Sequence, residues 1–266
     1  MARRNRLDAE LVRRGHARSR GHAAELIDGG YVSVNGTRAT KAATQVGTDQ
    51  AVVVKPPDDD PGYVSRGAHK LVGALDSFGI DPKGRRCLDA GASTGGFTDV
   101  LLRRGAAEVV AVDVGYGQLA WPLRSDERVR VLERHNVREL VPEQVGDPPP
   151  DLVVGDLSFI SLTLVLPALV RCSDPAADFV MMVKPQFEVG KDRVGAGGVV
   201  RDPELRAEAV RTVAAGARTL GLGVSDVAAS PLPGPSGNVE YFLWLRNDAP
   251  PLEEAALTEA ITRGPQ

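Results

Sequence analysis

The chain has 266 residues, of which 42% are hydrophobic and 25% charged, and its formal net charge is −3. This length favours one core domain with a small second domain, and the ordinary composition excludes wholesale disorder and fibrous repeats. No apolar run approaches the roughly 18 residues of a membrane span, and the charged N-terminus lacks a signal-peptide core, so we expect a soluble cytoplasmic protein without a membrane partner.

The first 57 residues are basic, although the whole chain is acidic. They carry ten Lys/Arg and five Asp/Glu, for a charge of +5, which leaves −8 for residues 58–266. Seven arginines lie within the first twenty residues. Such density suits a surface that binds nucleic-acid phosphates, because neutralising phosphates releases condensed counterions. A merely solvated arginine-rich end is the alternative.

The basic region reads as two short helices followed by strands. Leu7, Leu11 and Val12 predict a helix over residues 7–14 that ends at a glycine. A second helix follows, with Ser19 as its N-cap and the pair Gly29-Gly30 as its end. Strands are predicted over residues 31–34 and 52–54, and Asn35-Gly36 is a strong hairpin signal.

This region resembles the S-four-like RNA-binding domain. The positions that carry the resemblance are Ser19-Arg20, Ala23, Leu26-Ile27, Gly30, Val32, Val34 and Asn35-Gly36. In that family the helices present arginines to structured RNA, whose A-form major groove hides the base edges and leaves shape and phosphate to be read. The RNA-binding candidates are Arg4, Arg6, Arg18, Arg20 and Lys41. A small protein–protein module is the alternative.

A proline-rich and acidic stretch over residues 55–62 interrupts all periodicity and predicts a linker. We therefore expect an RNA-binding domain over residues 1–57, a linker over 58–64 and a second domain over 65–266. Apolar runs in the second domain alternate with helical stretches and predict strands at residues 86–90, 108–113, 129–131, 151–156, 179–183 and 239–245. This rhythm indicates a doubly wound, Rossmann-like α/β sheet behind a small N-terminal α+β domain.

A glycine-rich turn, Asp89-Ala-Gly-Ala-Ser-Thr-Gly-Gly-Phe97, follows the first of these strands. Its glycines allow a ligand to approach the backbone, and Asp113 ends the next strand, where an acid can bind a ribose diol. The turn lacks the spacing of a dinucleotide site and the lysine of a P-loop. The pattern resembles an S-adenosylmethionine site, with NAD as the alternative. Cys87, Cys172 and the four histidines lack metal-ligand spacing, so no metal and no disulfide are expected.

Four charged residues lie where predicted strands end or an entry helix begins. They are Lys70, Asp156, Lys184 and Glu240. A ribose hydroxyl is a poor nucleophile unless a base takes its proton, and a neutral lysine can do so while a carboxylate stabilises the resulting charge. Each residue alone could be an ordinary surface charge, whereas Lys184 and Asp156 directly follow the core runs Met-Met-Val and Val-Val-Gly.

This set resembles the lysine–aspartate–lysine–glutamate tetrad of the FtsJ-like ribose 2′-O-methyltransferases. Long blocks are similar to the TlyA, or haemolysin A, family across nearly the whole chain, among them residues 64–71, 88–98, 113–119, 156–162, 184–190 and 230–241. The resemblance implies 2′-O-methylation of cytidine in ribosomal RNA within ribosomal subunits, with catalysis by the four charged residues. One lysine would activate the hydroxyl and the others would orient it.

The resemblance also implies residues for the cofactor and the RNA. S-adenosylmethionine would be held by Ser65, Asp89, Gly91, Ser93, Thr94, Gly95, Gly96, Phe97, Asp113, Asn136 and Asp156. Phosphate contacts near the cofactor are expected from Arg66, Arg134 and Arg138, which could instead be solvated. The arginine-rich start resembles the longer family subtype, which modifies both 16S and 23S rRNA and influences sensitivity to capreomycin-type drugs. The family's linker tetrapeptide Arg-x-Trp-Val is replaced here by Pro61-Gly-Tyr-Val64.

Three other functions remain open at this point: a ribosome-assembly factor without chemistry, a membrane-active protein, and a small-molecule methyltransferase. The intact lysine and acid set argues against the first. The lack of a membrane span and of a long basic amphipathic helix argues against the second. The third would be indicated if deletion of residues 1–57 left the activity untouched.

Overall fold

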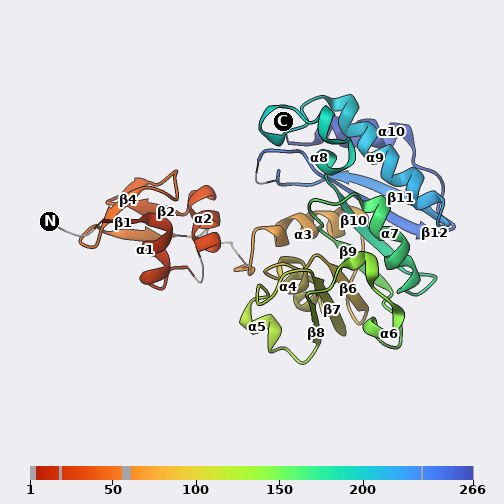
Figure 1. The fold of residues 1–266 in the computed structure, drawn as a ribbon, viewed down its shortest axis with the longest axis horizontal. Coiled ribbons are helices and arrows are strands. Elements are labelled where there is room, and N and C mark those ends of the chain that lie inside the picture. Colours follow the sequence, from red (N-terminus) through yellow and green to blue (C-terminus); the bar gives the residue numbers. More distant parts are fainter. Residues whose placement is uncertain (1–3, 18–19, 56–60, 235, 266) are drawn as a thin grey trace. The chain divides into compact units, whose positions relative to one another are not determined.

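The computed structural model describes residues 4–17, 20–55, 61–234 and 236–265. The chain divides into two compact units, Met1–Arg66 and Gly67–Gln266, each of which is described by itself (Figure 1). Residues 58–60 of the predicted linker and the predicted N-cap Ser19 lie outside the described residues. Residues 61–64 belong to the first unit.

The first unit contains the two predicted helices, α1 (Leu7–Arg13) and α2 (Arg20–Asp28). Its strands are β1 (Arg4–Arg6), β2 (Val32–Val34), β3 (Thr37–Arg38), β4 (Gln45–Gly47) and β5 (Val52–Val54). β2 pairs with β3 and β5, and Asn35 and Gly36 between β2 and β3 both have positive φ, of 49° and 80°, as the hairpin prediction requires. The pairing of β1 with β4 was not predicted. The core includes Leu7, Leu11, Ala23, Ile27, Val32, Val46 and Val52.

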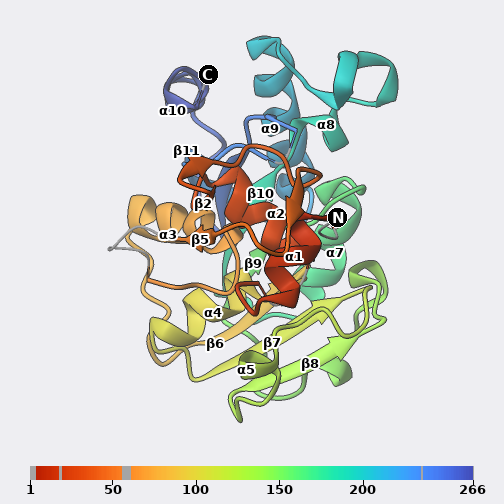
Figure 2. The ribbon, with the colours of Figure 1, turned by 90° about the vertical axis from the view of Figure 1, so that its left-hand side faces the viewer.

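The second unit is built on a seven-stranded sheet, which confirms the doubly wound prediction. The strands are β6 (Arg86–Ala90), β7 (Glu108–Asp113), β8 (Val129–Glu133), β9 (Leu152–Gly155), β10 (Asp178–Val183), β11 (Leu222–Ala229) and β12 (Tyr241–Asn247), in the order β11-β12-β10-β9-β6-β7-β8. β6, β7 and β8 lie side by side with β8 at the edge (Figure 2). β8, β9, β6, β7 and β10 run parallel.

Two features of this sheet differ from the sequence prediction. β12 is antiparallel to β10 and to β11, and β11 was not predicted at all. β11 contains a glycine, and its register shifts between Val224 and Asp226, so its side chains do not keep the alternation that identifies a strand. The last strand begins at Tyr241 and not at Val239.

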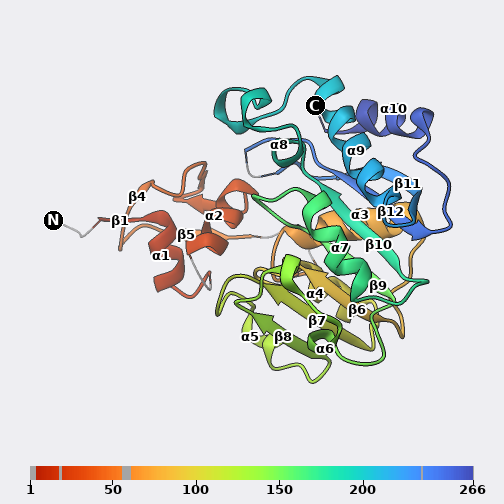
Figure 3. The same cartoon turned by 45° about the vertical axis from the view of Figure 1, so that its right-hand side comes forward.

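Helices cover both faces of the sheet (Figure 3). They are α3 (Gly67–Phe78), α4 (Gly96–Arg103), α5 (Trp121–Arg124), α6 (Pro142–Val145), α7 (Leu162–Arg171), α8 (Pro185–Glu188), α9 (Pro203–Arg218) and α10 (Glu254–Arg263). Side chains of β12 alternate between the faces: Phe242 and Trp244 contact the rings of Phe97 in α4 and Phe78 in α3. Leu243 belongs to the core cluster that includes α7 and α9. The alternation fixes which strand residues can reach a site at the sheet edge.

Candidate active site

Two buried lysine–carboxylate pairs lie in the second unit. Lys70 Nζ is 2.5 Å from Glu240 Oε2, and Lys184 Nζ is 2.5 Å from Asp156 Oδ1. Lys184 Nζ also donates a hydrogen bond of 2.8 Å to Ser158 Oγ. Both lysines are buried, which is rare for this residue unless it is paired.

The strand order explains why these residues meet. Asp156 directly follows β9 and Lys184 directly follows β10, and parallel strands end at the same edge of a sheet. β12 runs antiparallel, so its start lies at that edge too, and the register pairs Val183 with Tyr241. Glu240, which precedes Tyr241, is thereby placed next to the end of β10. Lys70 reaches the same edge from α3.

The four charges form one electrostatic group. Burial raises the pKa of Glu240 above the ordinary glutamate value, while Lys70 and Lys184 lower it and Asp156 raises it. The second oxygen of Glu240, Oε1, is buried and has no hydrogen-bond partner within the described chain. A buried carboxylate oxygen that lacks a partner in this way is rare in folded proteins and marks an unused acceptor in the site.

A cavity of about 470 Å³ opens beside the Lys184–Asp156 pair. This volume lies in the usual range for small-molecule sites. Five residues predicted to bind the cofactor line it: Gly91, Ser93, Asp113, Asn136 and Asp156. Asp113 ends β7 and the others come from the loops that follow β6, β8 and β9, so the cavity occupies the crevice at the carboxyl ends of the strands.

Asp113 is held rigidly at this cavity. Its Oδ2 accepts a hydrogen bond of 2.8 Å from the Ser93 amide, and its Oδ1 accepts one of 2.7 Å from the Gly115 amide. Each carboxylate oxygen keeps a free acceptor site after these bonds, because it has two lone pairs. The side chain can therefore accept both hydroxyls of a ribose diol.

The glycine turn after β6 brings the backbone of Gly91 close to the backbone of Asp156. Gly91 has a φ of 89°, and a Cβ at this position would lie 2.6 Å from the carbonyl oxygen of Asp156. Only glycine fits there without moving the loop that carries Asp156. A Cβ at Gly95 would instead collide with Leu123, so this glycine serves packing and does not face the cavity.

Asp89, another predicted cofactor residue, is fully buried and does not line the cavity. Thr98 Oγ1 donates a hydrogen bond of 2.7 Å to its Oδ2. Burial raises the pKa of Asp89 to about 7, an effect that the bond from Thr98 opposes. Asp89 is therefore placed to anchor the turn to the start of α4.

Several other predicted cofactor residues do not line the cavity. Thr94, Gly96 and Phe97 lie in the turn and the first turn of α4, and Phe97 packs against Phe242. Ser65 belongs to the first unit, as does the predicted RNA residue Arg66. The predicted roles of Thr94, Gly96 and Phe97 thus lack a contact with the cavity, and those of Ser65 and Arg66 stay predictions.

Sequence reasoning missed a set of residues that line the cavity after β9. They are Leu157, Ser158, Phe159 and Ile160, joined by Val114, Gln118, Val137 and Val165. Phe159 is 90% exposed and has a φ of 64°. The centroid of its ring lies 5.1 Å from the centroid of the Phe187 ring. A large aromatic residue with left-handed backbone on the surface is costly for folding, and such strain concentrates at functional sites. The signal available in the sequence was the block Asp-Leu-Ser-Phe-Ile-Ser after a buried strand.

The two predicted arginines near the cavity are exposed. The guanidinium of Arg134 lies 4.2 Å from the centre of the Tyr116 ring, in a cation–π contact. Arg138 follows Asn136, whose Oδ1 accepts a hydrogen bond of 3.1 Å from the Arg138 amide. Both arginines present positive charge on the loop that follows β8.

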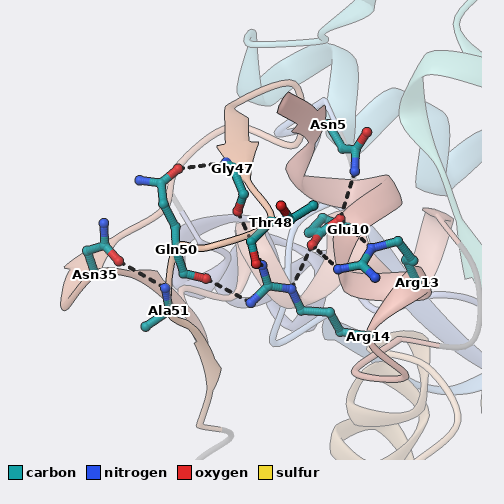
Figure 4. A network of polar contacts seen from close by, with 9 residues as sticks. All are labelled: Asn5, Glu10, Arg13, Arg14, Asn35, Gly47, Thr48, Gln50 and Ala51. Carbon is teal, nitrogen blue, oxygen red and sulfur yellow. Dashed lines mark hydrogen bonds and ion pairs between the residues drawn. The ribbon is translucent and has the colours of Figure 1, made fainter. Parts of the chain in front are cut away.

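In the first unit, the predicted RNA residues Arg4, Arg6, Arg20 and Lys41 are exposed, while Arg18 lies outside the described residues. Two acidic residues of α1 organise the arginines around them. Glu10, fully buried, accepts hydrogen bonds from Asn5, Arg13 and Arg14 (Figure 4). The hydrogen bond from Arg13, together with those from Asn5 and Arg14, holds the pKa of Glu10 well below its usual range.

Within the described ranges, no group of three or more His, Cys, Asp or Glu side chains could hold a metal ion. Over the same residues, no helix combines the length and the apolar character needed to span a membrane.

Known protein families match both parts of the chain. The FtsJ-like methyltransferase family matches residues 63–247, and the S4 domain family matches residues 5–52. The 16S/23S rRNA (cytidine-2′-O)-methyltransferase TlyA of Mycobacterium tuberculosis strain H37Rv is 63% identical over 100% of both chains. The 23S rRNA (cytidine-2′-O)-methyltransferase TlyA of Campylobacter jejuni is 33% identical over 85% of this chain and 93% of its own.

A solved structure supports the same relationship. The "Putative hemolysin from Streptococcus thermophilus" is 36% identical and superposes with a TM-score of 0.79, covering 99% of this chain and 96% of that one. The S4 match lies within residues 1–57, and the methyltransferase match covers most of residues 65–266.

Proposed function

The chain belongs to the TlyA family of rRNA (cytidine-2′-O)-methyltransferases, and we propose that it transfers the methyl group of S-adenosylmethionine to a cytidine 2′-hydroxyl in ribosomal RNA. The observation that carries the proposal is the position of Lys184. Its amine contacts Asp156 and Ser158, and both of these residues line the cavity.

The residues of the cavity fit S-adenosylmethionine. Asp113 would accept the ribose diol, and the apolar side chains of Val114, Leu157 and Ile160 suit a purine ring. The amino-acid end of the cofactor would lie at the glycine turn, where Gly91, Ser93 and Asp156 line the cavity. When bound, the cofactor supplies a methyl group on a positively charged sulfur.

The chain's own residues prepare the hydroxyl. Lys184, in its neutral form, takes the proton of the 2′-hydroxyl, and the adjacent carboxylate of Asp156 stabilises the ammonium that forms. The Lys70–Glu240 pair orients the sugar, with Glu240 Oε1 as an acceptor for a ribose hydroxyl. Holding the nucleophile in place converts an encounter into a reaction within one complex.

The target nucleotide must leave its stack to reach this depth. Phe159 offers an exposed ring next to Ser158, which Lys184 contacts, and the ring of Phe187 packs against that of Phe159. Base stacking on an aromatic ring is tolerant of sequence. We propose that this ring receives the extruded cytosine. Arg134 and Arg138 would bind the flanking phosphates.

The first unit supplies the wider RNA contact. Its arginines and Lys41 bind rRNA phosphates in this proposal, and the substrate is rRNA within assembled subunits. We assign both 16S and 23S rRNA as substrates. The support is the full-length similarity to the M. tuberculosis enzyme, whose name includes both RNAs, whereas the less similar C. jejuni relative is named for 23S alone. Loss of the marks is expected to change sensitivity to capreomycin-type drugs.

The experiment uses the full chain, the radiolabelled methyl donor, and 30S and 50S subunits from a strain that lacks the marks. We expect 2′-O-methylcytidine in both rRNAs, identified by nucleoside mass spectrometry and mapped by primer extension. Incorporation into neither subunit, or into bases only, would disprove the function. Incorporation into 50S alone would disprove the double specificity and leave the reaction intact.

A further inference from the structure

A second carboxylate of α1, Asp8, holds two of the predicted RNA-binding arginines. Its side chain is almost fully buried, with 6% exposure. Arg6 donates to both carboxylate oxygens at 3.1 Å, and Arg20 donates from Nε and Nη2 to Oδ2 at 3.1 and 2.8 Å. The Ala9 amide adds a bond of 2.8 Å to Oδ1. One buried carboxylate thus fixes two guanidiniums that are far apart in the sequence.

Both guanidiniums remain available to a ligand. The Arg6 and Arg20 side chains are 45% and 61% exposed, and all of their side-chain bonds among the described residues go to Asp8. Each arginine uses two of its five donors in this way, so three remain. These bonds and charges hold the pKa of Asp8 down at about 2, so the carboxylate stays ionised at neutral pH.

The spacing of the two arginines suits phosphate. Arg6 Nη2 and Arg20 Nη2 bond the same oxygen of Asp8, so they lie within about 6 Å of each other, the sum of the two bond lengths. A single phosphate group can bridge donors at this separation, because each N–H···O contact spans about 2.9 Å. Two guanidiniums that converge in this way bind phosphate with defined geometry as well as charge.

Glu10 offers an internal contrast on the same helix. Its partner Arg14 is only 18% exposed and donates to the backbone carbonyls of Gly47, Thr48 and Gln50 (Figure 4). That arginine therefore ties α1 to the loop between β4 and β5. Asp8 holds two solvent-facing cations together, whereas Glu10 holds one, Arg13, which is 55% exposed, and directs its other cation, Arg14, into the protein.

We propose that Asp8 is a positioning residue that holds Arg6 and Arg20 as a two-armed clamp for a phosphate of structured RNA. The proposal rests on the proposed rRNA function and adds to it an acidic residue that increases affinity for a polyanion. Fixing the two side chains before binding removes the entropy cost of ordering them in the complex.

This proposal predicts that the removal of a negative charge weakens RNA binding. The substitution Asp8→Asn preserves shape and removes one negative charge, so net charge alone predicts tighter RNA binding. Positioning predicts weaker binding, because the two arginines are released. We expect about tenfold weaker affinity for 50S subunits and a salt dependence lowered by about 0.7 in the slope of log K against log salt. Unchanged or tighter binding overturns the proposal.

The matched control is Glu10→Gln, which removes the same charge from the same helix. We expect it to lower the melting temperature while the folded protein binds subunits at least as tightly as the parent does. An equal loss of affinity in both variants would show that any buried acid of α1 has this effect, and the proposal would fall.

A double-mutant cycle separates positioning from folding. Adding Asp8→Asn to the variant Arg6→Ala/Arg20→Ala should weaken binding little further, since the residues on which Asp8 acts are absent. A full additional loss would indicate a folding role and overturn the clamp. If Arg6→Ala/Arg20→Ala itself leaves binding unchanged, the assignment of the first unit to rRNA fails as well. If Arg6→Ala/Arg20→Ala weakens subunit binding but Asp8→Asn does not, the positioning role of Asp8 is disproved and the assignment of the first unit to rRNA stands.

Discussion

Carboxylates hold cations in both units, but the two arrangements have opposite electrostatic consequences. In the first unit the cations are arginines, and they keep the pKa of Asp8 at about 2. In the second unit the cations are buried lysines, and burial raises the pKa of Glu240 despite them. Arginine cannot lose its proton in a protein, whereas lysine can.

This difference teaches how similar pairs serve different purposes. The arginine–carboxylate groups carry permanent charge at the surface, which suits binding to phosphate. The lysine–carboxylate pairs have low exposure and a poorly hydrated carboxylate, which suits the transfer of a proton. Variants of the arginine–carboxylate groups should therefore alter the affinity for subunits and its salt dependence, and variants of the lysine–carboxylate pairs should alter the rate of methyl transfer.

The largest effect is expected for Glu240→Gln. This change leaves the buried Lys70 without its charge partner and removes an acceptor from the site. We expect a loss of methyl transfer of at least about 100-fold with subunit binding retained. Tritiated methyl incorporation measures it. Glu108→Gln is the control, since Glu108 starts β7 at the opposite end of the sheet and pairs with Arg86. Comparable activity of Glu240→Gln and the parent would remove Glu240 from the mechanism.

Next in size is the effect of Asp113→Ala on the cofactor. Loss of a rigid carboxylate that binds the ribose diol should weaken the binding of S-adenosylmethionine by about 10- to 100-fold. Isothermal titration calorimetry measures this affinity. Glu127→Ala, which changes an exposed acid, should bind the cofactor as the parent does. Equal affinities of Asp113→Ala and the control would place the cofactor elsewhere.

A smaller effect, on the salt dependence of subunit binding, distinguishes the two units. The variant Arg6→Ala/Arg20→Ala should lower the slope of log K against log salt for subunit binding by about 0.7 to 0.9 for each phosphate that the protein no longer neutralises. Lys184→Ala should leave that slope unchanged, because its amine already faces Asp156. Identical slopes for both variants would erase the distinction between the units.

The smallest effect concerns the pH dependence of stability, and it has opposite sign in the two units. Asp8 has a lowered pKa, so its contribution is present above about pH 4 and is lost as pH falls toward 2. Burial raises the pKa of Asp89 from 3.8 to about 7, so its ionisation destabilises the fold as pH rises between those values.

Urea unfolding at several pH values tests this contrast. The substitution Asp89→Asn should flatten the decline of stability between pH 4 and 7, and Thr98→Val should steepen it, because the Thr98 hydrogen bond lowers the pKa of Asp89. If Asp89→Asn leaves the fall in stability between pH 4 and 7 unchanged, that fall comes from other titratable groups.

The sequence predicted much of the fold because several strands are buried on both faces. Residues 86–90 and 108–113 read as strand-like runs with apolar residues between charged ones, and they match β6 and β7 at both ends. β11 escaped prediction because its register shift breaks the alternation. The antiparallel direction of β12 depends on long-range pairing, which no local pattern specifies.

The sequence predicts the site residues that lie at strand ends, but not those whose position depends on loop conformation or on packing between helices. Asp113, Asp156 and Lys184 directly end or follow apolar runs, so their common edge followed from the parallel sheet. The exposure of Phe159 depends on a left-handed backbone that only the folded loop reveals. Asp8 lies in an arginine-rich stretch, and its pairing with Arg20 requires the packing of α1 against α2.

The most direct test of the account is single-turnover methyl transfer at saturating subunit and cofactor, performed with Lys184→Ala and with Arg6→Ala/Arg20→Ala. We predict that the lysine variant binds subunits normally and reacts at least about 100-fold more slowly. The arginine variant should bind more weakly and react at the parental rate once saturated. A Lys184→Ala enzyme with the parental rate constant would contradict the account.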